Sequence, residues 1–333
     1  MIRRSCVIAL ALLALGLAAD ATTLTLPLSQ VKPGMKGRGK SVFQGAAIEE
    51  FDVEILGVLE NIQPKRNVIL VRLRGRGLET TGIIGGMSGS PVYIDGKLIG
   101  AVAYGFSFSK EAIAGITPID EMLAIDRAPI DVKPGGAVAV PIRDDISQEE
   151  LSGTFLKSLE AGPQARPAGL TIAPLELPLM FSGFSTGAFE RARSFFAPLG
   201  FRAVRAGTGA QSRPGQPPGG PSLREGDAVG VQLLGGDLDI SAVGTATYVD
   251  GAKVLAFGHP LYNLGAVDYA MTRADVITVM PSLESSFKLT STGPVIGRFS
   301  QDRTAGAAGD VGVMPRLIPL NISLQSGPAV RRD

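Results

Sequence analysis

The stretch VYIDGKLI, residues 92–99, decides the fold class of this chain. Two short apolar segments flank Asp95-Gly96, and such a pair between hydrophobic runs is the strongest short-range signal for a β-hairpin. Hydrophobic residues also alternate with other residues at 51–55 and at 69–73, as expected for strands with one buried face. The pattern therefore predicts a β module over residues 22–130.

The rest of the chain divides by composition into further segments. Residues 131–205 are predicted to form a connector, with one amphipathic helix in which Phe189, Ala192 and Phe196 share a face. Residues 206–226 (AGTGAQSRPGQPPGGPSLREG) are predicted to be a flexible linker because they are rich in Gly and Pro. A second β module is expected over 227–325, with alternation at 243–247 and a turn at Asp250-Gly251, followed by a tail at 326–333.

Composition supports a mainly β fold with few helices. The 333 residues are 45% hydrophobic and 19% charged, and they include 43 Gly and 23 Pro, which indicates many turns. The chain has one Cys and one His, so a zinc finger, an iron–sulfur cluster or a multi-histidine metal site cannot be built within it. We expect no cofactor and no metal, apart from the alternative of an all-oxygen cation site.

The N-terminus has the pattern of an export signal. Arg3 and Arg4 precede an apolar run over 6–19, and Ala19-Asp20-Ala21 supplies small residues for cleavage. The run is shorter than the roughly 20 residues that span a bilayer, so a signal peptide over 1–21 is favoured over an uncleaved anchor, and no stable membrane span is expected afterwards. Removal would leave 30 basic and 30 acidic residues and no cysteine, and this balance argues against a nucleic-acid partner.

Two motifs resemble functional sites but are better explained locally. Residues 34–41 (GMKGRGKS) satisfy the phosphate-binding pattern, yet Pro33 precedes them and no helical run follows, so a Gly-rich turn and no nucleotide are expected. Residues 183–187 (GFSTG) match the nucleophile elbow of esterases. The favoured interpretation is that Ser185 and Thr186 cap the following helix, and an esterase using Ser185 remains an alternative.

A third motif, GGMSGSP at residues 85–91, is the best candidate for catalysis. A serine nucleophile requires an exposed hydroxyl and two N–H groups directed at the oxyanion, and flanking glycines permit that backbone geometry. Ser88 is the candidate nucleophile, although a simple Gly-Ser turn has the same composition. His259, the only histidine, ends an apolar segment (LAFGHP) and is suited to act as general base, although a lone histidine is more often structural.

At these motifs the sequence resembles the SpoIVB serine peptidase family. The matching segments are GMSGSP at 86–91, DGKLIGAV at 95–102, IDEML at 119–123, and GTATYVD at 244–250 leading to Gly258-His259. Together they cover roughly residues 34–125 and 228–312. The resemblance implies two chymotrypsin-like β-barrel modules with the site between them.

The resemblance also implies roles for individual residues. Ser88 would be the nucleophile, His259 the general base, and the N–H groups of Gly86 and Ser88 the oxyanion donors. In this family the histidine precedes the serine, whereas here Ser88 lies 171 positions before His259, so the segments are permuted. No PDZ-type module is recognisable.

The acid that would orient His259 is less well defined. Asp302 lies in a matching glycine-rich segment and is the candidate named for this role, although a surface pair with Arg303 or a turn cap is the favoured explanation of the residue taken alone. The other candidates are Asp268, Asp275 and Asp310, and a Ser-Lys dyad using Lys97 is a further alternative.

The sequence as a whole predicts an exported serine endopeptidase, periplasmic or extracellular, that acts on a protein or peptide substrate, with the chain itself as a further candidate substrate. The alternative is a non-catalytic envelope module that keeps a protease-like scaffold and binds an extended peptide by strand addition.

Overall fold

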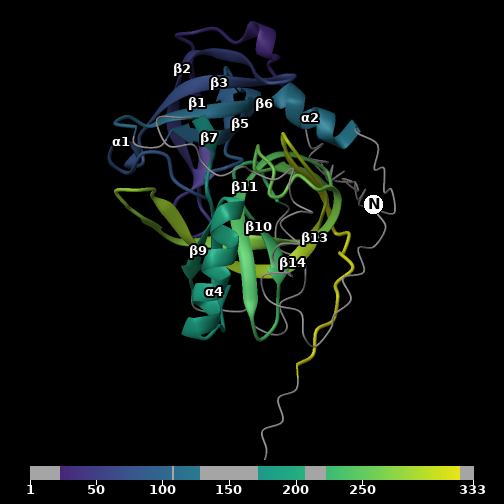
Figure 1. The fold of residues 1–333 in the computed structure, drawn as a ribbon. Coiled ribbons are helices and arrows are strands. Elements are labelled where there is room, and N and C mark those ends of the chain that lie inside the picture. The colour runs from purple at the N-terminus through teal and green to yellow at the C-terminus, as the bar shows by residue number, and fades with distance from the viewer. Residues whose placement is uncertain (1–22, 107–108, 128–171, 207–222, 323–333) are drawn as a thin grey trace, which may run out of the picture.

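The computed structural model describes residues 23–106, 109–127, 172–206 and 223–322, and most of them lie in β strands (Figure 1). The predicted signal peptide and tail lie outside the described residues. So do residues 131–171 of the predicted connector and residues 207–222 of the predicted linker.

The first module is a closed antiparallel barrel. Its strands are β1 (Lys36–Val42), β2 (Ile48–Gln63), β3 (Arg66–Arg74), β4 (Pro91–Ile94), β5 (Lys97–Phe106) and β6 (Ile113–Pro118). They pair around the ring in the order β1-β2-β3-β6-β5-β4, and β4 closes the ring on β1. Strand β7 (Ile172–Pro174) adds to β5. The helical segments are η1 (Leu28–Gln30), α1 (Leu78–Thr81) and α2 (Ile119–Arg127).

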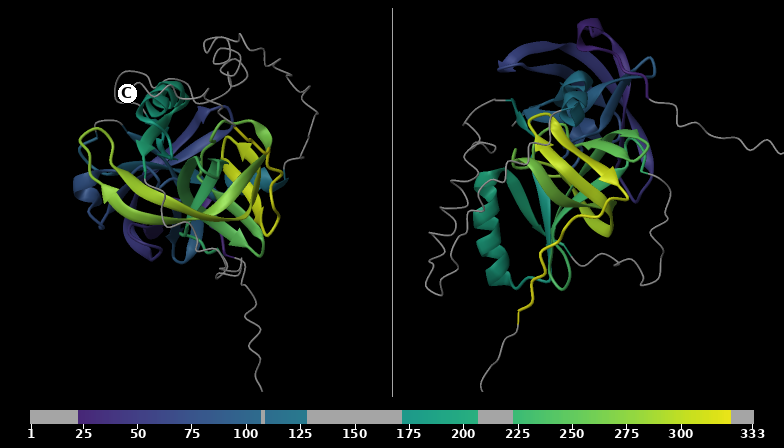
Figure 2. Two further views of the ribbon diagram at one scale, coloured as in Figure 1. Left: turned by 90° about the horizontal axis from the view of Figure 1, so that it is seen from below. Right: turned by 90° about the vertical axis from the view of Figure 1, so that its right-hand side faces the viewer.

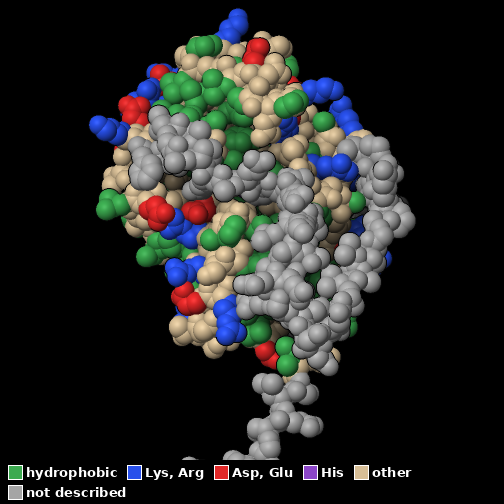
Figure 3. Space-filling model, viewed as in Figure 1, with side chains coloured by type: hydrophobic (Ala, Val, Ile, Leu, Met, Phe, Trp, Pro, Cys, Tyr) green, Lys and Arg blue, Asp and Glu red, His purple; other side chains and the backbone are tan. Residues whose placement is uncertain are grey.

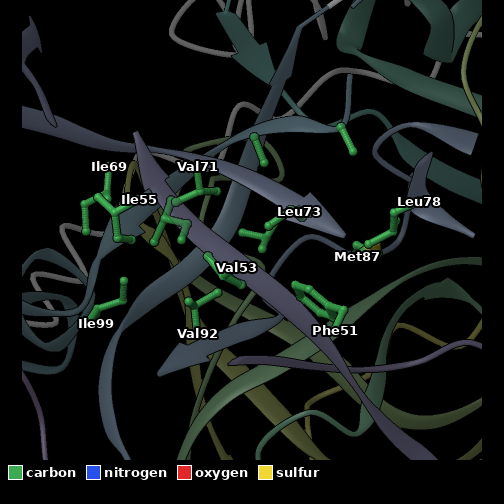
Figure 4. Packing of buried hydrophobic residues seen from close by; sticks show 14 of the residues in the cluster. Phe51, Val53, Ile55, Ile69, Val71, Leu73, Leu78, Met87, Val92 and Ile99 are labelled. Carbon is green, nitrogen blue, oxygen red and sulfur yellow. The ribbon is translucent and has the colours of Figure 1, made fainter. Parts of the chain in front are cut away.

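Alternation along the strands fills this barrel. Phe51, Val53 and Ile55 of β2 are buried and point toward the residues at 69–73 of β3 (Figure 4). Each such side chain stabilises the fold by about 1.5–3 kcal/mol relative to an exposed one. The hairpin at Asp95-Gly96 is confirmed, because both residues have positive φ (49° and 74°), as a two-residue turn between twisted strands requires.

The second module is also a closed barrel. Its strands are β10 (Ala228–Leu234), β11 (Asp239–Asp250), β12 (Lys253–Ala256), β13 (Gly265–Met280), β14 (Phe287–Arg303) and β15 (Gly306–Val311). The ring order β10-β11-β12-β15-β14-β13 repeats, strand for strand, the order of the first barrel. The expected pair of β-barrel modules with few helices is therefore confirmed.

Part of the predicted connector belongs to the second sheet. Strand β8 (Leu177–Ser182) pairs with β11, and β9 (Phe201–Arg205) runs parallel to β8 at the sheet edge. All six residues of β8 are buried, so this part of the predicted connector contributes to the core of the second sheet. The predicted helix is confirmed as α4 (Thr186–Phe196), followed by η2 (Ala197–Leu199). Its cap is confirmed too, since the Ser185 hydroxyl accepts the Ala188 N–H at 3.3 Å.

Two local predictions need correction. Residues 36–42 of the phosphate-loop-like segment form strand β1, where a Gly-rich turn was expected. Gly39 is required there by packing, because a Cβ would lie 2.2 Å from the Phe51 ring. The second Asp-Gly hairpin exists, but its two loop residues are Gly251 and Ala252, since Asp250 still pairs with Lys253.

The two barrels lie against each other, the first in purple and blue and the second in green and yellow (Figures 1 and 2). Isolated bridges join Gly45 to Val276 and Gly85 to Phe287 across the contact. On the face shown in Figure 3, positive and negative side chains are interspersed. In the described part of the chain, no helix is both long and apolar enough to cross a membrane.

Candidate active site

The serine loop, defined here as residues 85–90, lies between α1 and β4 at the contact between the barrels. Met87 anchors it in the core of the first barrel (Figure 4). Gly86 and Gly89 have φ values of +91° and +93°, a region that L side chains rarely adopt. A Cβ on Gly89 would lie 2.0 Å from the carbonyl oxygen of Thr245, so glycine is also required for the close approach of β11.

The loop leaves two of its N–H groups without an acceptor. The N–H groups of Gly85, Met87 and Gly89 donate to backbone carbonyl oxygens at 2.7, 3.0 and 2.8 Å, and Ser90 does likewise at 2.9 Å. For Gly86 and Ser88, the two predicted oxyanion donors, no acceptor is found within the described residues. A serine hydrolase requires two such N–H groups near its nucleophile.

His259 follows β12 and is held by its backbone. Phe257 and Gly258 have positive φ (70° and 71°), and the Thr117 hydroxyl of the first barrel donates to the Gly258 carbonyl at 2.5 Å. The Nδ1 atom of His259 lies 2.9 Å from the Pro260 carbonyl. A carbonyl can only accept, so Nδ1 carries the proton and Nε2 keeps its lone pair, the form a general base needs. Burial lowers the pKa of His259 to about 4, which keeps the ring neutral at pH 7.

Backbone hydrogen bonds connect Ser88 and His259 through β11. The carbonyl oxygen of Ser88 accepts the Thr245 N–H at 2.8 Å, and the carbonyl oxygen of Thr245 accepts the Phe257 N–H at 3.3 Å, two residues before the histidine. Ser88 is 0% and His259 2% exposed. Among the described residues, Ser88 Oγ and His259 Nε2 have no hydrogen-bond partner, so no hydrogen bond joins the two atoms.

Asp302 supports the histidine loop without touching the ring. Its carboxylate oxygens accept the N–H groups of Leu261 and Tyr262 at 2.8 and 2.7 Å. Burial raises the pKa of Asp302, and these N–H donors oppose that effect by stabilising the anion. Asp302 therefore fixes the backbone just after His259, while the ring itself is oriented by the Pro260 carbonyl.

The other predicted acids are engaged elsewhere or exposed. Asp268 pairs with Arg298 and Arg316, and Asp310 pairs with Lys253. Asp275 is exposed on β13. Within the described ranges, no group of three or more His, Cys, Asp and Glu side chains is arranged to hold a metal ion.

The remaining predicted alternatives lie at the surface. Lys97 is exposed directly after the Asp95-Gly96 turn, and Ser185 is exposed at the start of α4, where it serves as the cap.

Sequence reasoning missed two residues beside the serine loop. Lys288 of β14 is 0% exposed, and its Nζ donates to the Ser41 hydroxyl at 2.8 Å. Ser41 is the last residue of the phosphate-loop-like motif, which was interpreted as a turn. Its contact with Lys288 became visible only in the fold. One sequence signal could have revealed the burial of Lys288. Lys288 and Thr290 are two positions apart on a strand, so their side chains lie on the same face, and both are buried.

The structure thus defines a two-barrel β protein with a glycine-bounded serine loop at the contact between the barrels. Comparison with protein families gives a specific match: residues 22–123 match the model described as SpoIVB peptidase S55. The predicted resemblance is confirmed for this part of the chain, which includes the whole serine loop. No curated protein and no solved structure matches the chain.

Proposed function

We propose that this protein is an exported serine endopeptidase that acts on a protein substrate. The family match over the first barrel supports the peptidase class, and the permuted histidine segment supplies the base that this barrel lacks. The signal-like N-terminus supports export to the periplasm or the exterior.

The proposed chemistry is acyl transfer through Ser88. When the site closes on substrate, His259 Nε2 takes the Ser88 proton as Oγ attacks the scissile carbonyl carbon. The N–H groups of Gly86 and Ser88 stabilise the resulting oxyanion. The imidazolium then returns its proton to the leaving amine, and the C–N bond breaks to leave an acyl-serine. Water, deprotonated by His259, hydrolyses that ester and restores Ser88.

One observation carries this proposal. The Ser88 hydroxyl and the Nε2 of the only histidine are both buried and unpartnered, on backbone segments joined through Thr245. Leaving two buried polar atoms without partners costs about 1–3 kcal/mol each, so a functional requirement explains their retention. The neutral tautomer set by the Pro260 carbonyl matches the role of base.

A hollow beside the serine loop offers an approach for an extended peptide. A cavity of about 220 Å³ is lined by Gly82, Gly85, Gly105, Leu175 and Ser286, which come from both sides of the barrel contact. Because Ser88 is fully buried, the contact between the barrels must widen before a substrate reaches the hydroxyl, and this cavity borders the serine loop at Gly85. The catalytic proposal therefore includes an opening step.

Labelling with a fluorophosphonate probe tests the assignment. We expect the wild-type protein to be labelled, and Ser88→Ala and His259→Ala each to lose labelling while keeping a wild-type circular dichroism spectrum. Ser185→Ala is the matched control, because Ser185 is an exposed cap, and it should be labelled like the wild type. Labelling that survives in both Ser88→Ala and His259→Ala would refute the proposal.

A second function is favoured by the complete burial of Ser88. If the contact between the barrels never opens, the chain is a peptide-binding module on a protease-like scaffold. Within the part of the chain that the structure describes, strand β9 pairs with β8 alone, so its outer edge can accept an extended peptide. This function predicts no labelling of the wild type, together with peptide binding that is unchanged in Ser88→Ala.

A further inference from the structure

Lys288 is a buried lysine without a counter-charge. Its Nζ contacts the Ser41 hydroxyl at 2.8 Å and lies 5.7 Å from the centre of the Phe43 ring. No salt bridge within the described residues includes it, and no charged or titratable side chain perturbs it. Burial alone lowers the pKa of Lys288 to about 7, so the neutral amine is well populated at neutral pH.

The backbone of Lys288 is fixed to the serine loop. Its N–H donates to the Gly85 carbonyl at 2.9 Å, and Gly85 in turn donates to Ser286 at 2.7 Å. A Cβ on Gly86 would lie 3.3 Å from Lys288 Cδ, so the aliphatic part of the lysine packs directly on the predicted oxyanion donor. A displacement of Lys288 therefore displaces Gly85 and Gly86.

A chain of buried hydroxyls continues from Lys288 back to the same loop. Ser41 Oγ lies 2.9 Å from Ser90 Oγ, which lies 3.4 Å from Thr245 Oγ1, and Thr245 Oγ1 is 3.4 Å from the Gly86 carbonyl oxygen. All three hydroxyl residues are fully buried. Each hydroxyl has a single proton and two lone pairs, so the protonation state of Lys288 limits the direction in which the Ser41 proton can point.

The two protonation states of Lys288 place different demands on Ser41. A neutral amine can accept the Ser41 proton, while the Ser41 oxygen accepts from Ser90. An ammonium group can only donate, so the Ser41 proton must turn away from the lysine and the Ser41 oxygen accepts from both Lys288 and Ser90. The ammonium is also left in an apolar setting with one hydroxyl as acceptor, and separation of β14 from the loop relieves this cost.

We propose that Lys288 is a positioning residue for the serine loop, acting through Ser41, Ser90 and Thr245 on the Gly86 carbonyl and through its backbone on Gly85. The neutral amine holds the loop in its reactive form, and the ammonium loosens it. This inference rests on the proposed function for its link to catalysis, but the coupling of lysine to loop is independent of catalysis.

The pH profile of fluorophosphonate labelling at Ser88 separates this role from a merely structural one. The acid limb is the part of the profile in which the labelling rate falls as the pH is lowered. In the wild type we expect its midpoint near pH 7, with an about 25-fold fall in the labelling rate between pH 7.5 and 5.5. In Lys288→Met only His259 remains, so the limb should move toward pH 4 and the rate should change less than twofold over the same range. Lys32→Met, which changes an exposed lysine, is the matched control and should keep the wild-type limb.

A second pair of variants tests the proposal if Lys288→Met does not fold. Ser41→Ala keeps the lysine but removes the hydroxyl that Lys288 Nζ contacts, and the acid limb near pH 7 should be lost. Ser41→Thr keeps a hydroxyl and should restore that limb. An acid limb that stays near pH 7 in Lys288→Met or in Ser41→Ala would overturn the proposal.

NMR tests the coupling without any catalytic activity. In protein carrying ¹³C at lysine Cε, the Lys288 signal is assigned by its loss in Lys288→Met and should titrate near pH 7. The nitrogen of Met87 forms the peptide bond with the Gly86 carbonyl carbon. In the wild type, the amide signal of Met87 should titrate with the same midpoint as the Lys288 signal, and in Ser41→Ala it should stay constant. A Met87 signal independent of Lys288 refutes the positioning role, whereas an unlabelled wild type with coupled signals refutes only the peptidase.

Discussion

Burial of Lys288 makes the stability of the protein depend on pH in a defined window. The folded-state pKa of about 7 lies below the ordinary value of 10.5 that applies in the unfolded chain. Between these two values the unfolded chain binds one more proton than the folded protein, so the free energy of unfolding rises with pH. The contribution of Lys288 is complete above pH 10.5 and is lost as the pH falls to 7. At 1.36 kcal/mol per pH unit, the whole difference corresponds to about 5 kcal/mol.

The perturbation that isolates this effect is Lys288→Met, which keeps an unbranched side chain of similar length. Urea denaturation should be followed by far-ultraviolet circular dichroism, because the chain has no tryptophan. Between pH 7 and 9.5, the unfolding free energy of the wild type should rise relative to the variant by about 3 kcal/mol.

Buried tyrosines set the upper limit of the pH range for this measurement, and an exposed lysine provides the control. Burial raises the pKa of Tyr93, Tyr262 and Tyr269, so the unfolded chain loses these protons first above pH 10 and stability falls there. Subtraction of the variant removes this contribution, and Lys32→Met should show no pH-dependent difference from the wild type. A difference between wild type and Lys288→Met that is flat from pH 7 to 9.5, or that falls, would refute the inference that this lysine is buried without a counter-charge.

Three further outcomes follow from the structure. Because burial lowers the folded-state pKa of His259 to about 4, the wild type should lose about 3 kcal/mol between pH 6.5 and 4, and His259→Leu should lack this loss in urea titrations. Gly89→Ala should be destabilised by more than about 3 kcal/mol in the same assay, because its Cβ would meet the Thr245 carbonyl oxygen at 2.0 Å in a left-handed conformation; a stable variant would contradict the close approach of β11. Ser185→Ala should cost about 1 kcal/mol through loss of the hydrogen bond from the Ala188 N–H, and an unchanged unfolding midpoint would contradict that cap.

Several elements were predictable because their signals are local. The Asp95-Gly96 hairpin, the inward residues of β2 and the cap of α4 each depend on residues a few positions apart. The serine loop was also recognisable, because its glycines are needed for positive φ at Gly86 and Gly89. Strand β1 was mistaken for a turn, since its glycines are required by packing: Gly39 lies against the Phe51 ring and Gly37 against the Tyr93 carbonyl.

Other features depend on which strands become neighbours when the barrels close. Asp302 and the backbone of Leu261 are 41 positions apart, and Lys288 and Ser41 are 247 apart, so no local pattern reveals either contact. The sequence by itself determined the strands at 51–55 and 69–73, the Asp95-Gly96 hairpin, the serine loop and the single histidine, because period and turn chemistry act between near neighbours. Only the tertiary structure decided that a lysine would be buried beneath that loop and that Asp302 would hold the histidine segment by its backbone. The Asp302 contact forms when the second barrel closes, and the Lys288 contact forms where the two barrels pack together. Both steps bring together residues that carry no information about one another along the chain.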